Sequence, residues 1–164
     1  MSQEATKSDT MLPANVHDYQ VIAKTKLPKA LYEYLASGTD DEQTLAENIQ
    51  AFKNWYLRPR VMMPVKDLSA SCHLFGQRLS FPVFCTPAGV HALCDEEHGE
   101  LTTVRAAEKM GVMFALSQHA TRSIEDVAAA APNANKWYQA YILKDRELTL
   151  RLVQRAVKAG YRGE

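Results

Sequence analysis

Three units of a strand, a loop and a helix follow one another in the second half of the chain, and this repeat constrains the fold more than any other feature. β-rich runs predict the strands at residues 83–86, 113–117 and 137–142. A helix with a polar N-cap is expected after each strand, starting at Asp95, Ser123 and Asp145. Such units, repeated at about thirty residues, predict an α/β fold with a parallel sheet and right-handed crossovers.

A parallel sheet of this kind is either open and doubly wound or closed into a barrel. No GxGxxG pattern follows any of the three strands, which counts against a dinucleotide-binding open sheet. In a parallel barrel the chemistry lies at the carboxyl ends of the strands, where this sequence carries polar residues, proline or glycine. Gln139 is a candidate ligand contact, because a polar side chain inside a β-rich run needs a partner.

The region before these units has a helical pattern. We expect a disordered polar tail over residues 1–14, a helical and extended segment over residues 15–80, and the β/α units over residues 81–164. Helices are expected at residues 16–24, 28–38 and 39–56. Gly38 is interpreted as a left-handed cap that ends the second helix, and Thr39 with Glu42 as a capping box that opens the third. A small hairpin is expected around Gly76.

Charge and composition argue against several classes of function. Basic and acidic residues balance at 19 each, so nothing favours binding to nucleic acid or to a membrane, and a small-molecule ligand is expected. The apolar runs are shorter than the roughly 20 residues that a membrane span requires. The odd number of cysteines, 3, indicates free thiols in a reducing, intracellular compartment. No metal is expected, because the spacing of the candidate ligands does not match a closed zinc site (Cys72, His73, His91, Cys94 and His98).

Six stretches of sequence, in this order, resemble one known family. They are LPKALYEYLASGTDDEQTLAEN, RPR, FPVFCTPAGV, HGELTTVRAAEKMG, ALSQHATRSIEDV and KWYQAYILKDR. The resemblance is to the FMN-dependent 2-hydroxy-acid oxidase and dehydrogenase family, the group of glycolate oxidase, lactate oxidase and flavocytochrome b2. It runs over residues 16–160 and covers the N-terminal half of that family's domain.

The resemblance implies a TIM (β/α)8 barrel, of which this chain would hold the N-terminal helices and the first three β/α units. Three units do not close a barrel, so unpaired strand edges are expected near Val83 and Trp137. The resemblance also implies FMN as the cofactor, a small 2-hydroxy acid of the glycolate or lactate type as the substrate, and oxygen or another electron acceptor. The full-length relatives would be homo-oligomers in the cytoplasm or the peroxisome.

Site residues follow from the same resemblance, position by position. Cofactor contacts are implied at the edge of the flavin ring and at its pyrimidine end, by Pro87, Ala88, Gly89, Ser117 and Gln139. Tyr34 matches the tyrosine that binds the substrate carboxylate. Tyr141 matches a tyrosine that points its hydroxyl at the substrate during catalysis, and it is expected on the same strand face as Gln139. Without the resemblance, Tyr34 is interpreted as an ordinary residue of an amphipathic helix, whereas for Gln139 and Tyr141 a satisfied strand pair and a ligand contact are equally open alternatives.

The chain departs from the family in three respects. Ala140 stands where the family usually has leucine, and His119 stands where glycolate oxidase has a tryptophan that lines the substrate pocket. Three functional residues of the family lie in its C-terminal half. They are the histidine that acts as the general base, the arginine that binds the substrate carboxylate and the lysine that stabilises the reduced flavin. We therefore expect the 164-residue chain to be inactive by itself. The alternative function is a catalytically inactive fragment or interaction module of such an enzyme.

Overall fold

The computed structural model describes residues 12–163, so most of the tail expected at residues 1–14 lies outside the described residues. The chain divides into two compact units, Met1–Val61 and Met62–Glu164, and each unit is described by itself. No helix among residues 12–163 is long and apolar enough to cross a lipid bilayer.

The first unit consists of short helices, as the sequence pattern predicted. They are α1 (Val16–Lys26), α2 (Lys29–Ala36), α3 (Gln43–Gln50) and the 3-10 helix η1 (Ala51–Asn54). Asn15 caps α1, because its side chain accepts a hydrogen bond of 3.1 Å from the main-chain N–H of Asp18. The third helix ends at Gln50, earlier than expected, and the chain continues in the tighter 3-10 turn.

Both predictions about the boundary between α2 and α3 are wrong. Helix α2 ends at Ala36, and its C-cap is Ser37 with a φ of −87°, so Gly38 is not a left-handed cap. Helix α3 begins only at Gln43, and Thr39 does not cap it. Instead, the carboxylate of Glu42 accepts a 3.0 Å hydrogen bond from the N–H of Gly38, which stabilises a loop where a capping box was expected.

The second unit opens with the predicted hairpin. Strands β1 (Cys72–Leu74) and β2 (Gln77–Leu79) pair antiparallel, and Gly76 lies in the turn with a φ of +76°. A positive φ favours glycine, because any larger side chain is strained there. The aromatic ring of Phe75, also in the turn, lies 5.1 Å from the ring of Trp137.

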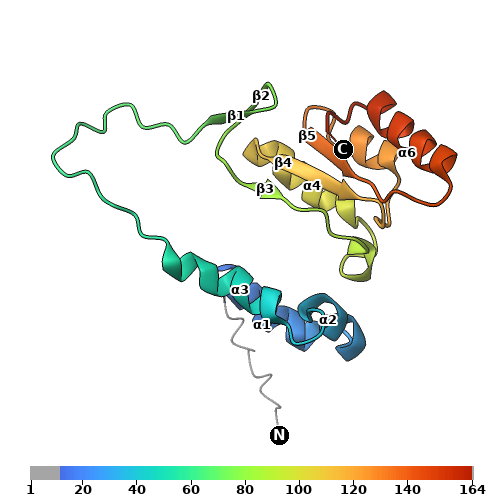
Figure 1. Cartoon of the computed structure of the whole chain (residues 1–164), viewed down its shortest axis with the longest axis horizontal. Helices are drawn as coiled ribbons and strands as arrows, with labels where there is room; N and C mark the ends of the chain where they lie inside the picture. The colour runs from blue at the N-terminus through green and yellow to red at the C-terminus, as the bar shows by residue number, and fades with distance from the viewer. Residues whose placement is uncertain (1–11, 164) are drawn as a thin grey trace, which may run out of the picture. The chain divides into compact units, whose positions relative to one another are not determined.

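The predicted parallel sheet is confirmed and consists of three strands. Figure 1 shows β4 (Met113–Ser117) between β3 (Phe84–Cys85) and β5 (Asn135–Gln139). Each strand is followed by a helix: α4 (Glu100–Met110), α5 (Ile124–Ala130) and α6 (Arg146–Lys158), and the short 3-10 helix η2 (His91–Leu93) precedes α4. The pairing register sets Ser117 opposite Gln139 at the carboxyl ends of β4 and β5.

One face of this sheet forms the hydrophobic core. Because successive strand side chains point to opposite faces, Phe114, Leu116 and Tyr138 share the face that packs against the helices. The helices and the C-terminal loop contribute Val104, Ala107, Ile124, Val127, Ala156 and Tyr161. The opposite face carries Ala115, Ser117, Trp137 and Gln139, and none of the helices of residues 62–163 covers it.

Two of the three helix starts predicted in this unit are confirmed. Ser123 caps α5 and Asp145 caps α6, each accepting a 3.0 Å hydrogen bond from the N–H three residues on, and Gly111 ends α4 with a φ of 65°. The start predicted at Asp95 is wrong, because α4 begins at Glu100. Asp95 caps the turn before it, where its carboxylate accepts from the N–H of His98 at 3.1 Å.

A buried lysine side chain binds main-chain carbonyls just after α5. Lys136 is 2% exposed, and its Nζ donates to three main-chain carbonyls at 2.7–3.2 Å, those of Ala131, Pro132 and Ala134. Burial lowers the pKa of this amine. A cation at the carboxyl end of a helix satisfies carbonyls that have no intrahelical partner, so Lys136 stabilises the crossover from α5 to β5.

The end of the third strand differs from the prediction in two ways. Strand β5 stops at Gln139, so Tyr141 is not a strand residue and shares no strand face with Gln139. The outer edge of β5 near Trp137 is not free, because the N–H of Arg162 donates to the carbonyl of Lys136 and the carbonyl of Gly163 accepts from Tyr138, both at 2.9 Å. The strands of residues 12–163 form these two sheets and no closed barrel.

Candidate functional site

Three loops meet where the parallel strands end. They follow β3, β4 and β5 and cover residues 86–90, 118–123 and 140–145. The N–H of Val90 donates to the carbonyl of His119 at 3.2 Å, which joins the first loop to the second. The N–H of Tyr141 donates to the side-chain Oε1 of Gln118 at 2.7 Å, which joins the second to the third. These two hydrogen bonds connect the three loops at the carboxyl ends of the strands.

Ser117 and Gln139, two of the predicted cofactor contacts, are brought together. The Oγ of Ser117 donates a 3.2 Å hydrogen bond to Oε1 of Gln139 and accepts one of 3.1 Å from the N–H of His119. Ser117 is 6% exposed, so these two protein contacts satisfy its hydroxyl in place of solvent. The amide nitrogen Nε2 of Gln139 has no acceptor among residues 12–163, which leaves a fixed donor at the edge of the sheet.

An open, mostly apolar cavity of about 480 Å³ lies beside Gln139. Its lining includes Phe84, Pro87, Met113, Ala115, Trp137 and Gln139, together with Leu74 and Phe75 of the hairpin. Apolar walls with one or two fixed polar groups are typical of small-molecule sites. Of the predicted contacts in the first loop, Pro87 lines this cavity, whereas Ala88 and Gly89 do not.

Gly89 lies where two loops approach closely. A Cβ atom at this position would lie 3.0 Å from the carbonyl oxygen of His119 and 3.1 Å from its Cβ. A Cβ atom at this position would require the two loops to shift by about a few tenths of an ångström, at the point where the N–H of Val90 donates to the carbonyl of His119. Ala88 is exposed on the same loop.

Tyr141 forms an aromatic pair that the sequence did not predict. Its ring centroid lies 5.0 Å from that of His119, with the planes tilted by 50°. Tyr141 is 51% exposed, so its side chain is accessible to a ligand while its main chain is held by Gln118. Tyr34 lies in α2 of the first unit and is 71% exposed; its role at the substrate stays a prediction.

Glu100, which joins two segments at this site, was not predicted from the sequence. It is the first residue of α4 and is fully buried, at 0% exposure. Its Oε1 accepts from the N–H groups of His91 (3.1 Å) and Thr121 (2.9 Å). Its Oε2 accepts from the Thr121 hydroxyl (2.7 Å) and the N–H of Arg122 (3.0 Å). A glutamate in a first helical turn is usually a surface residue, so nothing in the sequence marks this one as buried.

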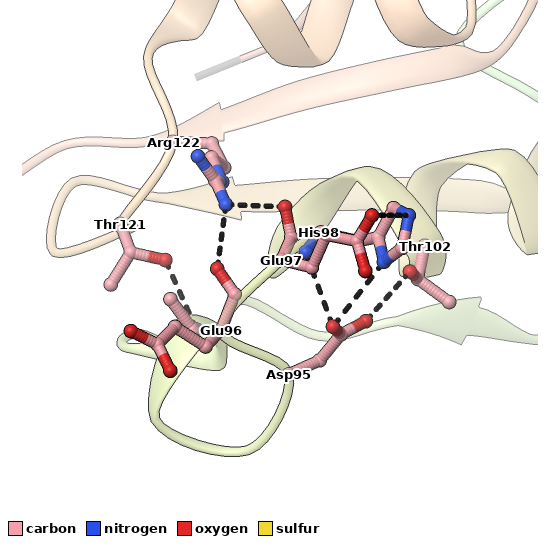
Figure 2. A network of polar contacts seen from close by, with 8 residues as sticks. Asp95, Glu96, Glu97, His98, Thr102, Thr121 and Arg122 are labelled. Carbon is pink, nitrogen blue, oxygen red and sulfur yellow. Dashed lines mark hydrogen bonds and ion pairs between the residues drawn. The ribbon is translucent and has the colours of Figure 1, made fainter.

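The turn before α4 is held against the loop after β4 by further polar contacts. Figure 2 shows Arg122 reaching the main-chain carbonyls of Glu96 and Glu97, at 2.9 and 2.6 Å. The Asp95 carboxylate faces His98 and Thr102, and the pKa of Asp95 is lowered, chiefly by the N–H of His98. The two contacts of Arg122 extend the connection that Glu100 makes between the same two segments.

Two of the residues weighed as zinc ligands have other side-chain partners. His98 lies beside Asp95, and Nδ1 of His91 lies 3.2 Å from the hydroxyl of Thr103. Within residues 12–163, no three His, Cys, Asp or Glu side chains gather as a metal site would require.

Comparison with known proteins gives consistent matches over nearly the whole chain. Residues 23–163 match the family described as FMN-dependent dehydrogenase. Human 2-hydroxyacid oxidase 1 is 46% identical over 147 residues, which are 90% of this chain and 40% of the human protein. Glycolate oxidase of Spinacia oleracea is 40% identical over 148 residues, with the same two coverages of 90% and 40%. The chain thus spans about 40% of the length of the relatives that it matches.

Solved structures agree with the sequence matches. A soluble mutant of the membrane-associated (S)-mandelate dehydrogenase from Pseudomonas putida superposes with a TM-score of 0.82 at 34% identity, over 90% of this chain and 41% of that one. The structural neighbours are FMN-dependent TIM-barrel enzymes, of which this chain corresponds to a part. With a family match that covers residues 23–163, the chain belongs to the FMN-dependent dehydrogenase family.

Proposed function

We propose that this chain supplies the flavin-facing part of an FMN-dependent enzyme that oxidises a small 2-hydroxy acid, of the glycolate or lactate type, to the 2-oxo acid. The observation that carries the proposal is the hydrogen bond between Ser117 and Gln139 beside the loop that contains Pro87. Two of the relatives are named as oxidases of a 2-hydroxy acid and of glycolate, which supports the substrate class.

The fold proposed for the complete protein is a (β/α)8 barrel. Residues 81–164 would form its first three β/α units, preceded by an N-terminal segment over residues 15–80. The parallel order β3-β4-β5 supports this assignment, as do helices on one face and a cavity on the other. The pairing of Arg162 and Gly163 with β5 adds support, because it continues the sheet in the direction of a further strand.

The residues present fit a flavin ring. An isoalloxazine is flat and largely apolar on its faces, and its pyrimidine end carries hydrogen-bond acceptors. The cavity beside Pro87 is mostly apolar, and Nε2 of Gln139 is a fixed donor at its rim. When bound, FMN would supply the acceptor for the two electrons that leave the substrate. Ser117 would keep Gln139 in one orientation, and the backbone of residues 87–89 would contact the ring edge.

The substrate contacts in this proposal are two tyrosines. Tyr141 would place its hydroxyl toward the 2-hydroxy acid, since its side chain is half-exposed and its main chain is held by Gln118. Tyr34 would bind the substrate carboxylate. Oxygen or another acceptor would take the electrons from the flavin, and the complete protein would act as a homo-oligomer inside the cell, in the cytoplasm or the peroxisome. The free cysteines Cys72, Cys85 and Cys94 support a reducing compartment.

A chimeric protein tests the proposal. Residues 1–163 are joined to the part of human 2-hydroxyacid oxidase 1 that follows its matched segment, and the purified chimera is analysed for bound FMN. Glycolate and lactate are then added without oxygen, and bleaching of the flavin absorbance is followed. We expect bound FMN and bleaching by at least one of the two acids. A chimera that folds and binds FMN but is bleached by neither acid would favour the alternative, a catalytically inactive fragment or interaction module.

A further inference from the structure

The strongest unassigned feature of the second unit is the buried carboxylate of Glu100. It accepts four hydrogen bonds, and their donors come from two segments that are far apart in the sequence. One donor is His91, which follows the loop of residues 86–90; the others are Thr121 and Arg122, which end the loop after β4. Each oxygen serves two donors, so the carboxylate has little capacity left for any other contact.

We propose that Glu100 is a positioning residue, which fixes the loop of residues 86–90 against the loop of residues 118–122 and so sets the distance between the Gly89 backbone and the pair of Ser117 and Gln139. That this distance matters for flavin binding rests on the proposed function. The link between the two loops does not rest on it, because the link consists of hydrogen bonds within this chain. Val90 reports on this link, since its N–H donates directly to the carbonyl of His119 in the other loop.

The residue before the carboxylate supports the close approach of the two loops. Gly99 has a φ of 54° and a ψ of −128°, a conformation that favours glycine. A Cβ atom there would lie 3.2 Å from the hydroxyl of Thr121 and 3.4 Å from the N–H nitrogen of Ala92. These same two groups form a hydrogen bond of 3.1 Å. Any larger residue at position 99 would therefore press on the junction that Glu100 holds.

A carboxylate suits this position and an amide does not. A glutamine side chain has only one acceptor oxygen. Its NH2 group is a donor, so it would face the N–H donors without being able to accept a hydrogen bond from them. Burial acts to raise the pKa of Glu100, but the hydrogen bonds from Thr121 and His91 outweigh it, and the pKa lies below its ordinary value of 4.5. The ionised form is therefore the one that holds the loops at neutral pH.

Hydrogen exchange of individual amides, measured by NMR on the 164-residue chain at a concentration at which the chain is monomeric, tests the proposal without any cofactor. In Glu100→Gln we expect the amide of Val90 to exchange at least about tenfold faster, while the amides of β4 keep their protection. Thr121→Val removes one donor to Glu100 and should accelerate Val90 by a smaller factor. Thr121→Ser keeps the hydroxyl and should behave as the unchanged chain does. Glu97→Gln, at an exposed neighbouring carboxylate, is the matched control and should change nothing.

The outcomes separate a positioning role from a merely stabilising one. If Glu100→Gln leaves the exchange of Val90 unchanged, the proposal is overturned. If Glu100→Gln loses protection throughout β4, the Thr121 variants decide: a faster Val90 in Thr121→Val that Thr121→Ser restores supports the proposal, and an unchanged Val90 overturns it. None of these results depends on FMN binding. The chimera can therefore disprove the proposed function while the exchange data support the role of Glu100, and the exchange data can disprove that role while the chimera supports the function.

Discussion

The hydroxyl of Ser117 donates a 3.2 Å hydrogen bond to the side-chain carbonyl of Gln139, and this contact joins the carboxyl ends of two neighbouring parallel strands. It orients the amide of Gln139 so that the nitrogen is left to donate elsewhere. A pair of polar side chains at this edge of a β/α sheet is where a ligand is expected. The proposed roles of Gln139 and of the nearby Tyr141 differ, and the difference can be measured.

Variants of these two residues in the chimera should separate cofactor binding from chemistry. Gln139→Ala removes one hydrogen bond to the ring, worth about 0.5–1.5 kcal/mol, and should weaken FMN binding by roughly two- to twelvefold or shift the flavin potential. Tyr141→Phe keeps the ring and removes only the hydroxyl, so FMN should stay bound while reduction by substrate slows. FMN titration and anaerobic stopped-flow reduction measure the two effects. Identical profiles for the two variants would refute this division of roles.

The 164-residue chain should not turn over a 2-hydroxy acid by itself. The resemblance assigns the general base and the carboxylate-binding arginine to positions outside residues 1–164, and loss of a positioned base alone costs on the order of 10²–10⁴-fold in rate. The measurement is anaerobic addition of glycolate or lactate to the purified chain with FMN. Bleaching of the flavin under these conditions would show that the present residues include a working base.

The uncovered face of the sheet should make the isolated chain associate. Trp137 and Phe84 line an open apolar cavity there, and no helix among residues 62–163 covers them. Because Arg162 and Gly163 pair with the outer edge of β5, we expect association through this face and through the β3 edge. Size-exclusion chromatography and binding of a hydrophobic dye measure it. A monodisperse monomer with a sharp thermal transition and little dye binding would contradict the expectation.

Glu100 should make the unfolding free energy depend on pH in acid. Its folded pKa is lowered, so its stabilising contribution is fully present above the unfolded value of 4.5 and is lost as the pH falls through the folded value. Denaturant unfolding between about pH 6 and pH 3 should therefore show a shallower acid loss in Glu100→Gln than in the unchanged chain. Equal slopes for the two proteins would rule out this contribution.

Local sequence signals predicted those parts of the fold that local chemistry decides. Strand β4 was predicted at its observed bounds, and the caps at Ser123 and Asp145 hold because one side chain and one nearby N–H suffice to make them. The failures depend on contacts within loops. The carboxylate of Glu42 accepts from the N–H of Gly38, and this contact replaces the expected capping box. Tyr141 lies outside the strand, where its N–H donates to the side chain of Gln118.

The site was predictable in part for a similar reason. Ser117 and Gln139 were assigned by family resemblance, and a strand register was needed to show that they meet. Glu100 could not be found, since a glutamate at the start of a helix has the same local pattern whether it is exposed or buried. The pairing of His119 with Tyr141 is likewise a consequence of how two loops close over the sheet.

A crystal structure of the FMN-loaded chimera would show which residues hold the flavin. We expect Nε2 of Gln139 to lie about 3 Å from an acceptor at the pyrimidine end of the ring, with the backbone of residues 87–89 against the ring edge. A flavin ring bound away from Gln139 and from residues 87–89 would contradict it.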